Sequence, residues 1–120
     1  MAVQTPKQSP DYRGNLSRLL FRHLNLRGWS PADLARVSGQ SKATISRLLS
    51  FTGAPYYRPA VRTIQAIAQA LKLTQEQRRE LFYTAFPEFQ VWDEAAEHGY
   101  TVDETNELLY DRGLPLLTNE

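Results

Sequence analysis

The side chains best suited to binding chemistry share one face of a short helix, predicted from Lys42 to about Ser50. With Ile45 as the buried reference and about 100° per residue, Leu48 and Leu49 fall on the buried side. The other side is small, polar and basic: it carries Ala43, Ser46, Arg47 and Ser50, with Lys42 and Thr44 on its flanks. Such a face fits the major groove of DNA, where an arginine or lysine can donate to guanine N7 and O6.

The charge distribution also favours a polyanionic partner. Residues 1–83 contain thirteen basic and four acidic residues, a net charge of +9, whereas residues 84–120 contain one basic and nine acidic residues, a net charge of −8. No Asp or Glu occurs from Gln40 to Leu73. A basic segment joined to an acidic one is typical of a nucleic-acid-facing module with an acidic tail. The alternative is a generic helical hairpin whose solvated faces carry these charges by chance.

A tight helical hairpin is predicted to hold the binding face. Ser30 can cap its first helix, Pro31 fits the first turn and Asp33 completes a capping box. Gly39 permits the positive φ that turns the chain, and Ser41 then caps the second helix. These signals predict two short helices joined by a sharp turn.

The packing of this hairpin follows from its apolar residues. Leu34, Ala35 and Val37 are expected to face inward from the first helix, and Ile45 and Leu48 from the second. Ala35 must be small because the second helix crosses the first close by. The inward residues of the second helix leave its opposite face in solvent.

Helical periodicity recurs along the rest of the chain. Helices are predicted near residues 14–27, 60–71, 89–98 and 102–112, with another from a capping-box start at residues 73–77 until Pro87. In the first 85 residues, these helices are expected to bury Leu16, Leu19, Leu20, Leu24, Val61, Ile64, Ile67, Ala68, Leu71, Leu81, Phe82 and Ala85. Strand-like alternation is absent from the sequence, so the predicted fold class is all-α.

The stretch from Trp29 to Leu48 resembles the Cro/C1-type helix-turn-helix regulators, the Xre family. The matching features are the Leu34-Ala35 pair, the turn residue Gly39 and the Ser-x-x-Thr-Ile-Ser-Arg run of residues 41–47. The likeness continues through residues 59–74 and covers about residues 14–84. It implies a five-helix DNA-binding domain of a transcriptional regulator that binds a palindromic operator as a dimer. In this chain a small C-terminal helical hairpin is expected to follow that domain.

The resemblance also implies roles for individual residues. By position in the recognition helix, the base-reading residues are Lys42, Ala43, Ser46 and Arg47. The family's usual glutamine is replaced by Pro31, so a phosphate is expected to bind backbone N–H groups near Ala32 instead. Ser38 and Gln40 stand where apolar residues are commoner, which predicts a loosely packed turn. The residues expected near the DNA backbone are Ser30, Ala32, Thr44, Ser50, Tyr56, Tyr57, Arg58 and Arg62.

The loop over residues 51–59 is rich in turn residues and aromatics. Tyr56, Tyr57 and Arg58, with Arg62 at the next helix start, are candidates for phosphate contacts because tyrosine hydroxyls and arginines commonly make them. Alternatively, one or both tyrosines cover the edge of the core.

Three segments are predicted: a flexible arm over residues 1–12, the DNA-binding domain over 13–85 and an acidic helical extension over 86–120. The extension is too rich in apolar residues for a disordered tail, and we expect it to form a small hairpin. Pairing through it would place two recognition helices about one DNA turn, roughly 34 Å, apart. Packing within one chain and docking of a basic protein partner are the alternatives.

The composition argues against other classes of function. The absence of cysteine excludes disulfides, thiolate catalysis and cysteine-ligated zinc. His23 is expected at the surface or the core edge, and Glu94 and His98 have the spacing of a metal pair without a third ligand. No glycine-rich phosphate loop or catalytic cluster occurs, so no enzyme activity, metal or cofactor is expected. The lack of a membrane-spanning apolar run or secretory signal predicts a cytoplasmic protein.

Two functions therefore remain from the sequence. The first is a sequence-specific transcriptional regulator, a dimeric repressor that occludes a promoter. The second is a protein-interaction module, such as an antitoxin, whose acidic C-terminal segment binds a partner protein.

Overall fold

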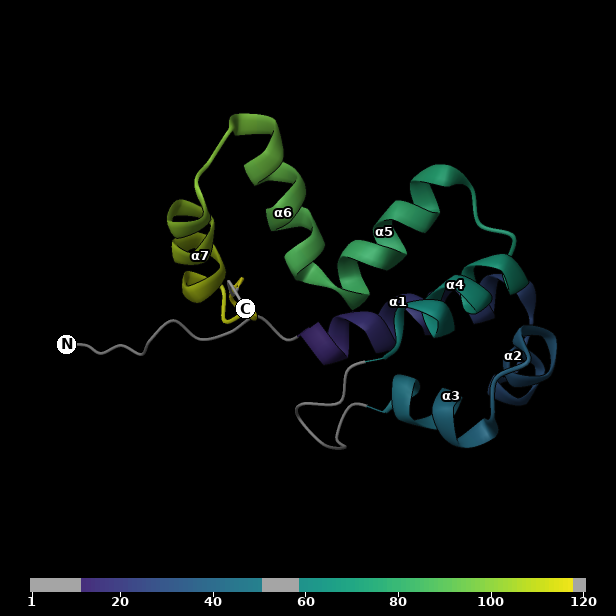
Figure 1. Cartoon of the computed structure of the whole chain (residues 1–120). Coiled ribbons are helices and arrows are strands. Elements are labelled where there is room, and N and C mark those ends of the chain that lie inside the picture. Colours follow the sequence, from purple (N-terminus) through teal and green to yellow (C-terminus); the bar gives the residue numbers. More distant parts are fainter. Residues whose placement is uncertain (1–11, 51–58, 118–120) are drawn as a thin grey trace. The chain divides into compact units, whose positions relative to one another are not determined.

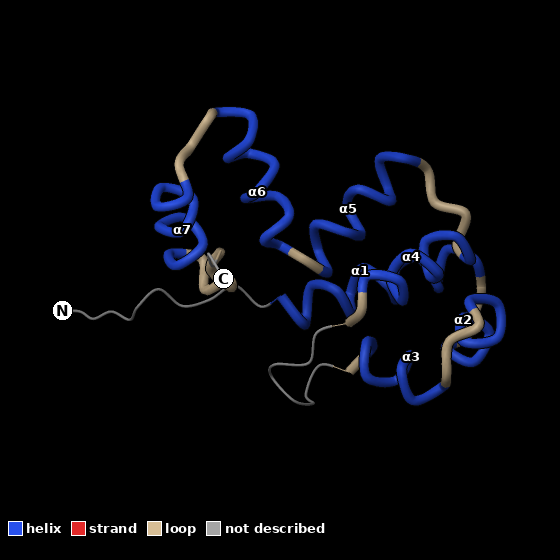
Figure 2. Tube along the Cα trace, viewed as in Figure 1, coloured by secondary structure: helices blue, strands red, loops and turns tan. Residues whose placement is uncertain are grey.

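The computed structural model describes residues 12–50 and 59–117, and all regular structure in these ranges is helical (Figures 1 and 2). The helices are α1 (Tyr12–Arg27), α2 (Pro31–Ser38), α3 (Lys42–Leu49), α4 (Val61–Ala70), α5 (Gln75–Ala85), α6 (Pro87–His98) and α7 (Val102–Asp111). The predicted all-α class is confirmed. Residues 1–11, which include most of the predicted arm, lie outside the described ranges, and Tyr12 already belongs to α1.

The helices form two compact units. The N-terminal unit is Tyr12–Ala85 and contains α1 to α5, while the described part of the C-terminal unit runs from Phe86 to residue 117 and contains α6 and α7.

Capping residues start the helices where the sequence predicts them. Ser30 Oγ accepts from the Asp33 amide at 3.1 Å while the Asp33 carboxylate accepts from the Ser30 amide at 2.9 Å. The same reciprocal pair joins Thr74 and Gln77 at the start of α5, at 3.0 and 3.1 Å. These bonds satisfy amides that have no acceptor within the helix. The starts of α2 and α5 are therefore encoded locally, whereas α4 and α6 begin without a side-chain cap.

The core of the N-terminal unit lies between α1 and the four helices that follow it. Helix α1 packs against α3 and α5, α2 packs against α3 and α4, and α4 packs against α5. Fully buried aliphatic side chains come from all five helices and include Leu20, Leu24, Leu34, Ile45, Ile64, Ile67 and Leu81. This core fixes α3 from one side only.

Two valines predicted to face inward do not. Val37 is 44% exposed and Val61 is 45% exposed. In α2 the buried residues are Leu34 and Ala35, and Val37 lies about 110° around the helix from the midpoint between them. Val61 is the first residue of α4 and lies about 90° from the centre of that helix's buried stripe. Both positions are apolar in sequence but fall outside the packed arc.

The C-terminal unit pairs α6 with α7. Helix α6 begins at Pro87, two residues before the predicted start, because proline is favoured in the first helical turn. Gly99 ends it with a φ of 70°, and a capping box between Thr101 and Glu104 starts α7. The buried apolar side chains in the described part of this unit are Phe86, Val91, Ala95, Leu109 and Leu114. On α6, ring centroids of Phe86 and Phe89 lie 4.9 Å apart and those of Phe89 and Trp92 lie 5.2 Å apart.

Candidate nucleic-acid interface

Helix α3 presents the face that the sequence assigns to binding. Its inner residues Ile45 and Leu48 are 1% and 2% exposed, so the helix is anchored firmly along one side. The four residues expected to read bases, Lys42, Ala43, Ser46 and Arg47, are all exposed. The structure thus brings these four together on one solvent-facing surface.

Both ends of α3 are fixed by serines. Ser41 Oγ accepts from the Thr44 amide at 3.0 Å and donates to Thr44 Oγ1 at 2.9 Å. At the other end, Ser17 Oγ of α1 donates to the Leu49 carbonyl at 2.8 Å inside the core. This bond satisfies a terminal carbonyl of α3 and ties the helix to α1.

Ser17 is a positioning residue that sequence reasoning missed. Its side chain is fully buried, in a helix that also buries Leu16, Leu20 and Leu24. A hydroxyl within an apolar stripe must find a hydrogen-bond partner, and this signal is visible in the sequence. The identity of the partner, the Leu49 carbonyl 32 residues away, is visible only in the fold.

The turn between α2 and α3 contains polar rather than apolar contacts. Gly39 has a φ of 74° and donates its amide to the Ala35 carbonyl, as expected for a left-handed helix end. Ser38 Oγ accepts from the Gln40 amide at 3.4 Å, and Gln40 Oε1 accepts from Thr63 Oγ1 at 3.4 Å. The second of these long hydrogen bonds connects the turn to α4.

The start of α2 combines an available amide with a fixed carboxylate. Ala32 is the second residue of α2, so its amide has no acceptor inside the helix. Asp33 next to it bonds the Ser30 amide and Arg36, and the hydrogen bond from the Ser30 backbone is the main cause that lowers the pKa of Asp33. An anion that binds at Ala32 therefore lies beside a carboxylate whose charge is already paired with Arg36 at 3.0 Å.

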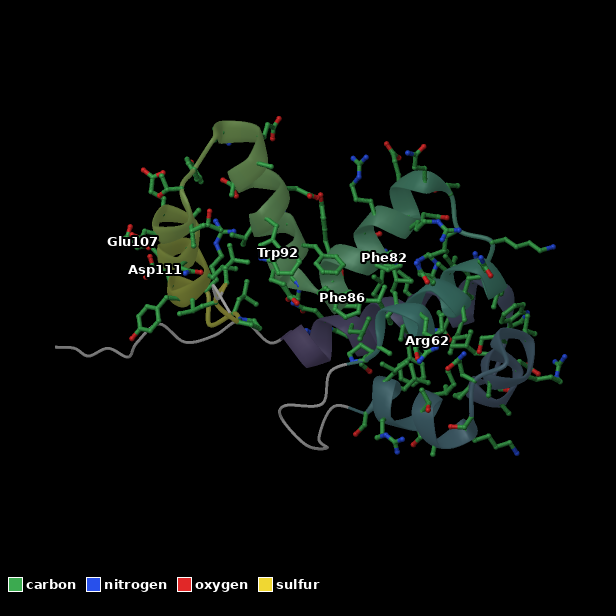
Figure 3. All side chains as sticks on the ribbon, in the orientation of Figure 1. Arg62, Phe82, Phe86, Trp92, Glu107 and Asp111 are labelled. Atoms are coloured by element: carbon green, nitrogen blue, oxygen red, sulfur yellow. The ribbon has the colours of Figure 1, made fainter. Side chains whose placement is uncertain are left out.

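The other residues predicted to contact the DNA backbone lie on several elements. Thr44 is half-buried in the first turn of α3, and Ser50 is the residue that ends α3. Arg62 is exposed in the first turn of α4 and is labelled in Figure 3. Tyr56, Tyr57 and Arg58 lie outside the described residues.

The basic residues of the N-terminal unit divide into two groups. Arg22 pairs with Glu80 at 3.3 Å, and Arg27 donates to the Leu71 carbonyl at 2.7 Å, so both serve the fold. The side chains of Lys42 and Arg62 make no hydrogen bond or ion pair with any residue that the structure describes. Unpaired cations at the surface are suited to an external anion.

His23 was predicted to lie at the surface or the core edge. The structure instead buries it, with only 2% of the residue exposed. Burial is the main cause that lowers its pKa from the ordinary value of 6.5, and the positive charges of Arg27 and Arg22 act in the same direction, while Glu80 opposes them. Its Nδ1 lies 3.3 Å from Arg27, whereas its Nε2 has no hydrogen-bond partner. The histidine is a structural member of the core.

Glu94 and His98 do not assemble a metal site with a third ligand. Glu94 lies 3.8 Å from Arg112, and His98 Nδ1 lies 3.0 Å from the Glu94 carbonyl. Across the described residues, no group of three or more His, Cys, Asp or Glu is arranged to hold a metal ion. In the same residues, every helix is too short or too polar to span a membrane.

Comparison with known proteins agrees with the geometry of α2 and α3. A family model described as the Cro/C1-type HTH DNA-binding domain matches residues 16–77, just over half of the chain. No curated protein and no solved structure matches the chain. The match confirms the resemblance seen in the sequence. The chain belongs to the family of Cro/C1-type helix-turn-helix DNA-binding domains.

Proposed function

We propose that this protein is a sequence-specific transcriptional regulator, a dimeric repressor that reads the major groove of an operator with α3. The observation that carries the proposal is the exposed face of α3, anchored by Ile45 and Leu48 and bearing no carboxylate. A short helix with small outward side chains can approach base edges closely.

The base-reading roles follow from side-chain chemistry. Arg47 and Lys42 donate to guanine N7 and O6, and Arg47 can do so with two parallel hydrogen bonds. Ser46 donates to or accepts from a neighbouring base, and the Ala43 methyl group packs on thymine. The exposure of all four side chains supports these assignments.

Contacts to the DNA backbone are assigned to residues at the ends of α3 and on the segments next to it. Arg62 contacts a phosphate from the first turn of α4, which its lack of a partner among the described residues supports. At the start of α2, Ser30 Oγ is already occupied by the Asp33 amide, so the contact there is made through the Ala32 amide. Thr44, Ser50, Tyr56, Tyr57 and Arg58 complete the proposed set.

Dimerisation is assigned to the C-terminal unit. This unit carries exposed apolar side chains, among them Tyr110, Leu116 and Trp92, which are 76%, 47% and 39% exposed. Apolar surface of this kind marks interfaces when it is contiguous. A two-fold pair would place two α3 helices on successive major grooves of a palindromic operator.

The second candidate function is a protein-interaction module, such as an antitoxin, whose C-terminal unit binds a partner. It is favoured by one feature of α7, where Asp103, Glu107 and Asp111 recur every four residues and are exposed beside Tyr110. Figure 3 labels Glu107 and Asp111 on this helix. The acidic surface suits a basic protein and repels DNA.

Selection of bound fragments from random double-stranded DNA tests the proposal. The full chain is expected to enrich one sequence arranged as an inverted repeat. Enrichment of a single half-site without its repeat would contradict the proposed dimer. A pool whose sequences stay random would contradict sequence-specific DNA binding. Sedimentation of the full chain is compared with that of a Tyr110→Ser, Leu116→Ser double variant. If the C-terminal unit forms the dimer, the double variant should lose the dimer. If that unit only binds a partner protein, the oligomeric state should not change.

A further inference from the structure

A hollow of about 400 Å³ opens in the N-terminal unit beside the reading face of α3. Its lining comes from three helices: Phe21 of α1, Pro31 and Ala32 at the start of α2, and residues along α3 that include Lys42, Ile45 and Ser46. Small-molecule sites in proteins occupy roughly 300–1,000 Å³. The hollow is therefore large enough for a small organic ligand.

The chemistry of the lining is that of a ligand site with an apolar interior. Ile45 and Leu49 are 1% and 7% exposed, and Phe21 is half-buried, so they provide an apolar wall. Lys42 is the single ionisable residue of the lining, and Ser46 adds a hydroxyl. Apolar surface with a few placed polar groups is typical of sites for small molecules.

The charge at the hollow selects an anion. No acidic side chain lines it, and the sequence has no Asp or Glu between Asp33 and Glu76. Asp33 is bound to the Ser30 amide and to Arg36, while Lys42 has no partner among the described residues. The Lys42 ammonium is therefore available to a carboxylate, with which it makes a charge-assisted hydrogen bond.

We propose that this hollow binds a small carboxylate with an aromatic or short aliphatic body, and that this ligand releases DNA. The second half rests on the proposed function. Lys42 and Ser46 belong both to the lining of the hollow and to the base-reading face, so the same side chains cannot serve ligand and operator together. Binding of one must weaken binding of the other by the same factor.

Titration of the full chain with 1-naphthoate tests the site without DNA. Amide shifts in two-dimensional NMR are expected to gather at Phe21, Ala32, Lys42 and Ser46, and the neutral 1-naphthalenemethanol should bind more weakly. Lys42→Gln is expected to weaken naphthoate binding about tenfold, because a hydrogen bond to a charged group is lost. The matched control, Lys72→Gln, changes another exposed lysine, outside the lining, and should leave the affinity unchanged.

A second variant tests the volume of the hollow rather than its charge. Ala32 is exposed in the first turn of α2, so Ala32→Leu should keep the fold while its larger side chain obstructs the hollow and abolishes the shifts. Equal binding by wild type, Lys42→Gln and Ala32→Leu, or shifts spread over other surfaces, would overturn the site.

Fluorescence anisotropy of the selected operator tests the effector role. Naphthoate is expected to release the DNA, with a midpoint that rises as the operator concentration rises. Naphthoate that occupies the hollow while the operator stays bound would overturn the effector role and leave the proposed DNA binding intact. A chain that binds naphthoate but no DNA would instead refute the proposed function, and the effector role with it.

Discussion

The two units of this protein use the same local devices to build helices with opposite surfaces. Each contains a capping box, Ser30 with Asp33 and Thr101 with Glu104, and each contains a left-handed glycine that ends a helix. The net charge nevertheless differs, from +9 over residues 12–85, with twelve basic and three acidic residues, to −8 over residues 86–120. Capping boxes and left-handed glycines therefore indicate where helices form, but they do not indicate what the helices bind.

The outward faces of α3 and α7 carry the difference. Helix α3 exposes Lys42, Ala43 and Arg47, which are small or basic, and keeps its large apolar residues inside. Helix α7 exposes acidic residues and Tyr110, which is 76% exposed. A small basic face suits a DNA groove, whereas an acidic face with an exposed aromatic suits a protein surface.

The largest expected effect on stability comes from truncating one buried side chain in the core of each unit. Ile45→Ala and Leu109→Ala each remove a side chain that is at most 1% exposed and should each cost about 2–5 kcal/mol of unfolding free energy. The fluorescence of each tryptophan reports the unfolding of a different unit, because Trp29 lies in the N-terminal unit and Trp92 in the C-terminal unit. Urea unfolding in Trp92→Phe and Trp29→Phe backgrounds should show each loss in its own unit. A Trp29 transition that Leu109→Ala weakens as much as Ile45→Ala would contradict the separation.

The next largest effect tests base reading by α3. Arg47→Ala should weaken binding to the selected operator by about 1–3 kcal/mol, with a much smaller loss on random DNA. Arg79→Ala, an exposed arginine on α5, is the control for loss of positive charge. Fluorescence anisotropy on both DNAs measures the difference, and equal losses on the two would exclude a base-reading role.

Ser17→Ala tests how the core holds the reading helix. It removes the 2.8 Å bond to the Leu49 carbonyl and should cost about 1 kcal/mol of stability in the N-terminal unit. Ser38→Ala, which removes only longer hydrogen bonds, should cost less. Denaturant midpoints followed through Trp29 compare the two, and a larger loss for Ser38→Ala would contradict the role of Ser17.

Arg62→Ala should have a smaller effect that does not depend on sequence. A phosphate contact stabilises every DNA alike, so the variant should weaken operator and random DNA equally. The slope of log affinity against log salt should fall by about one. Measurements over a range of salt concentrations decide this, with Gln65→Ala, an exposed neighbour on α4, as the control. An unchanged slope would remove Arg62 from the interface.

The smallest expected effect is a pH dependence confined to the N-terminal unit. Because the folded-state pKa of His23 is lowered, the unfolded chain binds more protons, and stability should fall as pH drops below about 6.5. His23→Gln should flatten this dependence in the Trp29 transition. His98→Gln changes the other unit and should leave that transition as it is. A pH dependence that survives His23→Gln would assign it to another group.

The sequence correctly predicted those features that depend on neighbouring residues. The capping boxes at Ser30 and Thr74, the turn at Gly39 and the exposed face around Arg47 all follow from spacing over one or two turns. Residues whose role depends on distant elements were missed. Val37 was expected inside and is exposed, and His23 was expected near the surface and is buried.

The sequence alone determined the capped helix starts at Ser30, Ser41 and Thr74 and the helix end at Gly39, because these features are satisfied by atoms a few residues apart. It also fixed the charge of each segment. Only the tertiary structure decided which face of each helix is covered, because burial depends on the helices that pack against it. The bond from Ser17 to Leu49, the packing of His23 and the hollow beside Lys42 all join elements that are far apart in the chain.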